Sequence, residues 1–244
     1  MPRFFVNKEL IDGNKIYIKE GDAHHIARSL RMAEGDEVTV SDGEGKEYSC
    51  RLTRIRDEEC ECEILSEEVS RAESPVDITL CMAYPKGDKL ETVIQKAVEL
   101  GVSRILPFES SRCIKRPKAE KIDKQLSRLS KIAEEAAKQC GRAKIPEVLS
   151  PVGYKDMLNY AVKRELTLFC YEAEEDSSVK NILKSHTAPA TCAVIVGSEG
   201  GFSEEEVKEA VAAGATIVSL GKRILRCETA PDYVLSAISY EYEL

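Results

Sequence analysis

The sequence predicts an α/β protein in which a mostly parallel sheet follows a smaller β-rich domain. In the first seventy or so residues, short segments alternate apolar and polar residues or are rich in β-formers, which is typical of strands. Further along, short apolar segments alternate with amphipathic helical ones, an order that favours a parallel sheet covered by helices. Two late apolar segments stop at glycines and lead into helix-capping residues. We therefore expect two domains, residues 1–72 and residues 73–244.

The N-terminal domain is predicted to contain four strands and one helix. The sequence Asp42-Gly43-Glu44-Gly45 supplies a turn between two of the strands. The helix, residues 22–31, places Ile26 and Leu30 four residues apart on a core face. The strands are expected at Arg3–Val6, Glu37–Ser41, Lys46–Arg54 and Glu59–Leu65.

Imidazole and guanidinium groups crowd the rest of that helix. A lone histidine is more often structural, but two His and two Arg within eight residues, with Arg3 joining them, indicate an edge that faces phosphates. The four residues are His24, His25, Arg28 and Arg31.

The charge distribution leaves the question of nucleic acid open. A formal net charge of −8 counts against RNA as a partner, because affinity for RNA depends on neutralising phosphates. Residues 112–144, in contrast, are strongly basic. A basic face of this kind is compatible with RNA, and equally with a solvated helix surface.

After a linker at Glu73-Ser74-Pro75, strands and helices are expected to alternate. Gly101 and Gly141 are predicted to end two of the helices. The strands are expected at Ile78–Ala83, Arg104–Phe108 and Leu166–Tyr171, and the helices at Lys89–Leu100, Lys121–Gln139, Asp156–Lys163, Val179–Leu183 and Asp232–Tyr242.

Composition favours a soluble cytoplasmic protein with reduced thiols. The 244 residues contain no apolar run near the ~20 that a membrane span needs, and no charged-then-apolar leader. Nine cysteines, an odd number mostly within predicted strands, argue against a disulfide framework. Cys60 and Cys62 are predicted to lie on one face of a strand, and without a second pair we expect no zinc or other metal site.

Two stretches near the end of the chain carry the functional signal. In the first, Ala193–Val196 is predicted to be a buried strand that ends at Gly197. Gly200 and Gly201 leave bare backbone that a ligand can approach closely. Ser203 and Glu206 form a capping box, so that a helix begins there.

The second stretch repeats this arrangement. Ala215–Leu220 is predicted to be a buried strand, which ends at Gly221. Thr229 and Asp232 are predicted to cap a helix, and Pro231 is predicted to lie in the first turn of that helix. The connecting loop carries Lys222, Arg223, Arg226 and Glu228. In an open α/β sheet ligands bind at the carboxyl ends of strands, so we expect the two loops to form a binding site.

These stretches resemble the cofactor loops of the SPOUT (trefoil-knot) methyltransferases, and specifically of the RsmE family. Residues 197–202 resemble the family's G-P-E-G-G-F signature, and residues 220–230 its L-G-x-R-I-L-R-x-E-T-A signature. Ser198 stands where the family usually has Pro, and Cys227 where it usually has Thr. His25 to Met32 is similar to the pattern of the family's PUA-like RNA-binding domain, and residues 86–142 resemble the family closely as well.

The resemblance implies a knotted α/β methyltransferase domain with an N-terminal PUA-like β-barrel domain. It also implies S-adenosylmethionine as cofactor, a homodimer, and methylation of N3 of a uridine (position 1498 in the standard bacterial numbering) in the 16S ribosomal RNA of the small subunit. A third cofactor loop is expected at Cys170-Tyr171-Glu172. The cofactor-binding residues implied are Cys170, Tyr171, Val196, Gly197, Glu199, Gly200, Gly201, Leu220, Gly221, Ile224, Leu225 and Arg226, with Ile224 and Leu225 packing the adenine.

Uracil N3 is a weak nucleophile while it is protonated, so a group must take the proton or stabilise the anion. We consider Glu228 as base and Arg226 or Arg223 as stabilising cation, with a helix-dipole role as the alternative for Glu228. The residues expected to contact RNA are Arg3, His24, His25, Arg28, Arg31, Lys86, Lys89, Arg112 and Arg142. Two other functions stay open: a SPOUT enzyme with a different target nucleotide, and a non-catalytic RNA-binding or ribosome-assembly factor.

Overall fold

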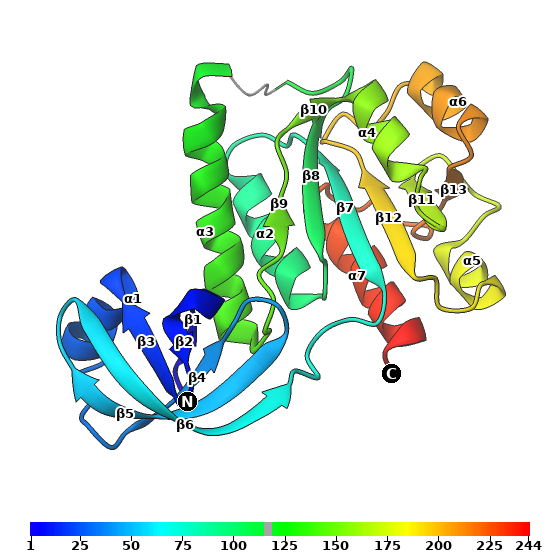
Figure 1. The fold of residues 1–244 in the computed structure, drawn as a ribbon. Helices are drawn as coiled ribbons and strands as arrows, with labels where there is room; N and C mark the ends of the chain where they lie inside the picture. Colours follow the sequence, from blue (N-terminus) through cyan, green and yellow to red (C-terminus); the bar gives the residue numbers. More distant parts are fainter. Residues whose placement is uncertain (115–118) are drawn as a thin grey trace. The chain divides into compact units, whose positions relative to one another are not determined.

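The computed structural model describes residues 1–114 and 119–244, and Lys115, Arg116 and Lys118 of the predicted basic segment lie outside this part. The chain forms two compact units (Figure 1). The first unit contains residues 1–73 and 137–145, and the second contains residues 74–136 and 146–244. Within the described residues no helix is long and apolar enough to cross a bilayer.

The first unit is a curled sheet in which, over the described residues, six strands follow the order β1-β4-β5-β6-β3-β2. Strands β1 and β4 are parallel, and the other neighbours are antiparallel. The strands are β1 (Arg3–Phe5), β2 (Ile11–Asp12), β3 (Lys15–Lys19), β4 (Glu37–Ser41), β5 (Lys46–Ile55) and β6 (Glu59–Val69). The four predicted strands are confirmed, whereas β2 and β3 were not predicted.

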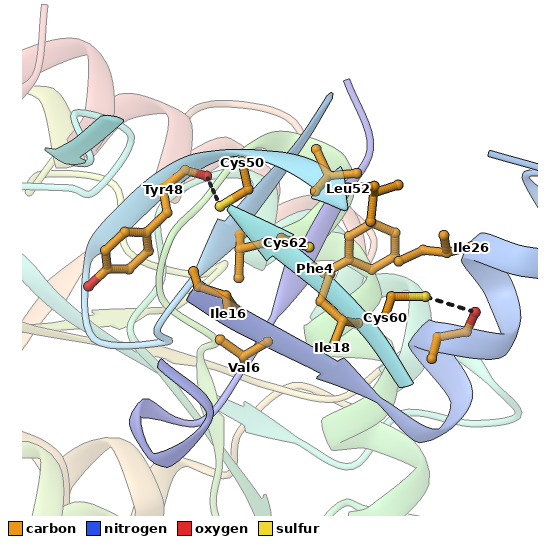
Figure 2. Packing of buried hydrophobic residues seen from close by; sticks show 13 residues of the cluster. Phe4, Val6, Ile16, Ile18, Ile26, Tyr48, Cys50, Leu52, Cys60 and Cys62 are labelled. Carbon is orange, nitrogen blue, oxygen red and sulfur yellow. Dashed lines mark hydrogen bonds between the residues drawn. The ribbon is translucent and has the colours of Figure 1, made fainter. Parts of the chain in front are cut away.

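The alternation of residues on these strands builds a single core. Cys60 and Cys62 on β6 face Ile18 and Ile16 on β3 and are fully buried, which confirms that the two cysteines share one face. Figure 2 shows them among Phe4 and the other apolar side chains of this cluster. All nine cysteines lie within the described residues and are free thiols. Burial raises the pKa of Cys62 to about 12, so this thiol stays protonated.

The predicted helix 22–31 has a different form. An α-helical turn, α1 (Glu20–His24), continues as a π-helical turn at His25–Ser29, and Arg31 has a φ of 52°. Ile26 is buried as expected, but Leu30 is 40% exposed, so its prediction as a core residue was wrong. Leu30 follows the last residue of the π-helical turn and precedes Arg31, whose φ is positive, so the helix ends before Leu30 can join the face of Ile26.

The second unit is a parallel sheet in which seven described strands participate. The order is β10-β8-β7-β12-β11-β13, with β9 beside β8. The strands are β7 (Asp77–Ala83), β8 (Arg104–Glu109), β9 (Glu147–Val148), β10 (Val152–Gly153), β11 (Leu166–Cys170), β12 (Thr191–Val196) and β13 (Thr216–Val218). The α/β prediction is confirmed, although β9 and β10 were not predicted.

Helices connect and cover these strands. Helices α2 and α7 pack against each other (Figure 1). On α2 the buried face contains Leu90, Val93, Ile94 and Ala97. The helices are α2 (Lys89–Glu99), α3 (Ile122–Cys140), α4 (Tyr154–Ala161), α5 (Val179–Ser185), α6 (Glu204–Ala212) and α7 (Thr229–Tyr242).

The strand order brings the ends of β12 and β13, the two strands that precede the predicted binding loops, close together. Strand β11 pairs with β12 on one side and with β13 on the other, and all three run parallel. Their carboxyl ends therefore lie together at one edge of the sheet, as ligand-binding α/β sheets require. Passage of the chain through its own loop is a separate property, which stays a prediction from the family resemblance.

Candidate functional site

A cavity of about 520 Å³ lies where the loops after β11, β12 and β13 meet. The predicted cofactor residues that line it are Cys170, Tyr171, Val196, Gly197, Glu199, Gly201, Leu220, Gly221, Ile224, Leu225 and Arg226. Lys89, Glu172, Ser198, Ser219, Lys222, Arg223, Cys227 and Ala230 complete its lining. The structure thus brings together three separate loops of the sequence. The cavity between them has a volume suited to a small molecule.

The first loop is a tight glycine turn after β12. The backbone N–H of Gly201 donates to the carbonyl of Ser198 at 2.9 Å, and Gly201 has a φ of 62°. A Cβ on Gly201 would lie 2.5 Å from Oε1 of Glu172, a residue of the third loop. A Cβ on Gly197 would lie 3.1 Å from the ring of Phe202. Gly197 is therefore closely packed within the loop itself, whereas Gly201 is favoured by its left-handed backbone.

Gly200 has a different role from the one predicted. The described residues that line the cavity do not include it. A Cβ on Gly200 would lie 2.9 Å from Cβ of Arg112, and the Arg112 guanidinium donates to the Gly200 carbonyl at 3.1 Å. Because Gly200 has no side chain, the segment that carries Arg112 can pack directly against its backbone. Arg112, predicted to contact RNA, uses one N–H to hold the glycine turn.

The predicted capping box at the start of α6 is confirmed, and it extends further than the sequence indicated. Ser203 Oγ accepts from the Glu206 N–H, and the Glu206 carboxylate accepts from the Ser203 N–H at 2.9 Å. The same buried carboxylate accepts from the N–H and the hydroxyl of Ser111, at 2.7 and 2.9 Å. Glu206 therefore ties the first loop to the segment that carries Arg112.

The second loop is exposed and cationic. Lys222, Arg223 and Arg226 are exposed, and Ile224 has 86% of its surface accessible, while Leu225 is half-buried. Gly221 has a φ of 107°, a conformation that glycine adopts without strain. The loop presents its cations at the mouth of the cavity.

The predicted cap at Thr229 was wrong. Helix α7 begins at Thr229 and its N-cap is Glu228, at which the described residues make no side-chain cap hydrogen bond. Asp232 instead forms an ion pair with Lys96 of α2 at 2.8 Å. Pro231 does lie in the first turn, as expected.

Lys89 joins the first and second loops. Its ammonium group lies 3.1 Å from Oε1 of Glu199 and 3.1 Å from Oε2 of Glu228. The Glu199 carboxylate also accepts from the backbone N–H of Lys86. Burial by itself raises the pKa of Glu199, but hydrogen bonds from its own backbone N–H, from Lys89 and from Lys86 outweigh burial, and the pKa lies below its usual value. The structure places Lys89 in the wall of the cavity, and the predicted contact of Lys89 and Lys86 with RNA stays a prediction.

The electrostatics of Glu228 bear on the predicted chemistry. The Cys227 thiol donates to Oε2 of Glu228 at 3.1 Å, and this bond, together with the Glu228 backbone N–H and Lys89, lowers the pKa of Glu228 to about 2. Burial raises the pKa of Cys227 to about 12, which keeps the thiol a donor. A general base is most effective when its pKa lies near the working pH, so Glu228 is poorly suited to that role.

The residues predicted to contact RNA in the first unit fall into two groups. His24, His25 and Arg31 are exposed, and Arg28 is exposed while it pairs with Asp57. Arg3 pairs with Glu47 and is largely buried. Arg142 is 4% exposed and its guanidinium donates to Glu73 at 2.7 Å. A guanidinium buried and paired in this way does not reach a phosphate, so the predicted RNA contact of Arg142 is replaced by a structural one.

Some lining residues were absent from the prediction. Ser198 and Cys227 lie inside the predicted loops, whereas Ser219 lies in the strand that was predicted before the second loop. Glu172 ends the predicted third loop. Lys89 comes from a helix more than a hundred residues earlier, and only the packing of α2 against α7 brings it to the cavity. Among the described residues no cluster of three or more His, Cys, Asp or Glu could hold a metal ion.

Comparison with known proteins identifies the family. An RNA methyltransferase domain matches residues 72–239, and an RNA methyltransferase PUA domain matches residues 18–65. The chain is 32% identical to ribosomal RNA small subunit methyltransferase E of Bacillus subtilis, over 100% of this chain and 98% of that protein. The crystal structure of the Neisseria gonorrhoeae protein of the same name, bound to S-adenosyl methionine, is 34% identical, with a TM-score of 0.88 over 98% of this chain and 97% of that one.

A Legionella pneumophila protein solved with the bound cofactor SAM is 32% identical, with a TM-score of 0.86 over 98% of this chain and 96% of that one. These matches span both compact units and include the three loops that line the cavity. The chain belongs to the ribosomal RNA small subunit methyltransferase E family.

Proposed function

We propose that this protein transfers a methyl group from S-adenosylmethionine to N3 of a uridine in the 16S ribosomal RNA of the small subunit. The observation that carries the proposal is the convergence of three loops at the carboxyl ends of β11, β12 and β13 around one cavity, in a member of this family. We assign residues 1–72 to RNA binding and residues 73–244 to catalysis, in a cytoplasmic homodimer.

The residues of the cavity fit the cofactor. Its volume of about 520 Å³ accommodates a nucleoside with a short side chain. Backbone from Val196 to Gly197 and from Leu220 to Gly221 offers amide and carbonyl groups to the adenosine, and Leu225 supplies apolar surface. The carboxylates of Glu172 and Glu199 suit the positive charges of the sulfonium and ammonium groups.

The bound cofactor supplies an electrophilic methyl group, and the side chains of this chain prepare the nucleophile. Arg226 and Arg223, exposed at the mouth of the cavity, stabilise the negative charge that develops on the uracil as its N3 proton passes to solvent. Glu228, with its low pKa, remains a carboxylate that holds Lys89. Positioning of the two reactants supplies much of the rate.

RNA binding is assigned to the exposed side chains of the first unit. His24, His25 and Arg31 offer donors to phosphates, and Arg28 does so when it leaves Asp57, a pair that solvent weakens. Arg112 and Lys86 extend this set near the cavity loops.

The proposal is tested by mass spectrometry of 16S RNA nucleosides from cells with and without this protein. We expect 3-methyluridine only where the protein is present. A methyl group on a different nucleoside would indicate another target, and no methylation combined with RNA binding would favour an assembly factor.

A single variant tests the assigned cation. Arg226→Ala is expected to lower the transfer rate by about 10²-fold or more, the scale of a lost charge-stabilising donor, while the protein still folds. Lys208→Ala, an exposed cation on α6 outside the cavity, is the control and should retain the wild-type rate. Normal turnover by Arg226→Ala would remove Arg226 from the mechanism.

A further inference from the structure

Lys89 occupies a position that its sequence context did not indicate. It is the first residue of α2, and its ammonium group bridges a carboxylate of the loop after β12 and a carboxylate at the start of α7. The side chains of Glu199 and Glu228 are 27% and 21% exposed, so both carboxylates are more than two-thirds covered. Without the cation between them, two anions would face each other across the cavity wall.

The neighbouring contacts fix the geometry of this bridge. The Glu199 carboxylate also accepts from the Lys86 N–H, and the Glu228 carboxylate also accepts from the Cys227 thiol. Each carboxylate thus has one partner from its surroundings and shares Lys89 with the other. Movement of either loop would break an ion pair with Lys89, so the two walls are coupled through one side chain.

A second ion pair between the same helices provides a comparison. Lys96, seven residues after Lys89 on α2, pairs with Asp232, four residues after Glu228, at 2.8 Å. Seven residues and four residues both return to nearly the same face of a helix, so the two pairs form one row between α2 and α7. The Lys96 pair joins only the helices, whereas the Lys89 pair also reaches the first loop and lines the cavity.

We propose that Lys89 is a positioning residue that fixes the distance between the two cofactor loops by bridging Glu199 and Glu228. The inference rests on the proposed function, because it assumes that S-adenosylmethionine binds between these loops. It assigns to Lys89 a role in cofactor affinity in place of RNA contact. The substitution Lys89→Met removes the positive charge and keeps an unbranched apolar side chain of similar length.

The test is calorimetric titration of the full chain with three ligands: S-adenosylmethionine, S-adenosylhomocysteine and methylthioadenosine, which lacks the amino-acid part. Lys89→Met is expected to weaken all three by about three- to tenfold, the range that two partly exposed ion pairs can supply. Lys89→Arg, which keeps the charge, is expected to stay within about threefold of wild type. Lys96→Met, the matched loss of an interhelical ion pair, is expected to leave all three affinities unchanged.

The outcomes separate the possible roles. Loss of affinity for the first two ligands but not for methylthioadenosine would show a direct contact between Lys89 and the amino-acid carboxylate, and would overturn the positioning role. Unchanged affinities of Lys89→Met for all three ligands would also overturn it. Equal losses in Lys96→Met would mean that helix packing alone is responsible. Failure of the wild-type chain to bind any of the three would overturn the proposed function, and this inference with it.

Discussion

Single residues decide how the cavity holds its shape, and Gly201 is the clearest case. Its φ of 62° lies in the left-handed region, and a Cβ would lie 2.5 Å from Glu172 Oε1. The carboxylate can swing away because the side chain is exposed, but the backbone strain persists. At Gly201 the loop after β12 therefore lies very close to the loop after β11, and both surround the proposed cofactor site.

We predict that Gly201→Ala lowers both stability and affinity for S-adenosylmethionine. The unfolding free energy should fall by roughly 1–2 kcal/mol from the left-handed conformation. Gly214→Ala is the control: Gly214 has a φ of 96°, no described atom lies within 4 Å of its Cβ position, and it is outside the cavity. Calorimetry and urea unfolding should show similar stability losses for both variants and a loss of affinity for Gly201→Ala alone.

Glu228 predicts a pH dependence of stability. Its ordinary pKa of 4.5 falls to about 2 in the folded chain, because the Cys227 thiol and Lys89 favour the carboxylate. A depressed folded-state pKa stabilises the fold fully above about pH 5, and this contribution is lost as the pH falls from 4.5 towards 2. Glu228→Gln should lower the unfolding free energy at pH 7 by on the order of 1–3 kcal/mol and flatten its decline in acid.

Unfolding free energies measured from pH 7 down to pH 3 check this. Glu241→Gln, at the exposed opposite end of α7, should follow the wild-type curve. If Glu228→Gln follows that curve as well, the carboxylate is not held in the folded state as described.

At the scale of elements, the network around Glu206 holds the first loop in place. The carboxylate caps α6 and accepts two further hydrogen bonds from Ser111. It is 6% exposed, so each of its bonds is made to a buried charge. Such bonds contribute more than neutral ones.

We predict that Glu206→Gln costs about 2–3 kcal/mol of unfolding free energy, since an amide N–H₂ would face the N–H donors of Ser111 or Ser203. Ser178→Ala, which removes the simpler cap of α5, should cost about 1 kcal/mol. Denaturant unfolding compares the two. A loss in Glu206→Gln no larger than that in Ser178→Ala would contradict the network.

Elements were predicted where a local pattern determines them. The strands β4 and β12 and the capping box at Ser203 follow from alternation, apolar runs and cap spacing, and all three are confirmed. The short strands β9 and β10 each contain two residues, too few for a period to show. The cap at Thr229 was mistaken because Asp232 pairs with Lys96, a contact between distant segments.

The π-helical turn at His25–Ser29 shows the same limit. The spacing of Ile26 and Leu30 is that of an α-helix, but the helix ends at Ser29 in a π-helical turn that this spacing does not reveal. Arg142 is a further example. It belongs to a basic segment of the sequence, yet it is buried against Glu73 in the first unit.

At the scale of the whole molecule, the sequence predicts which kinds of elements occur but not how they pair. The pairing of β12 with β7 depends on contacts between residues more than a hundred positions apart. The return of residues 137–145 to the first unit is equally invisible to a boundary drawn along the chain. The two late loops were located from their strand, glycine and cap patterns, the third loop and the cofactor from the resemblance, and the sheet explains why the three loops meet.

The central claim is that the loops after β11, β12 and β13 clasp the cofactor between them. A crystal structure of this chain with S-adenosylhomocysteine tests it most directly. We expect the nucleoside to lie against the backbone of residues 196–201 and 220–226, with Lys89 still bridging Glu199 and Glu228. Binding at any other place, or a cavity closed by side chains at saturating ligand, would contradict it.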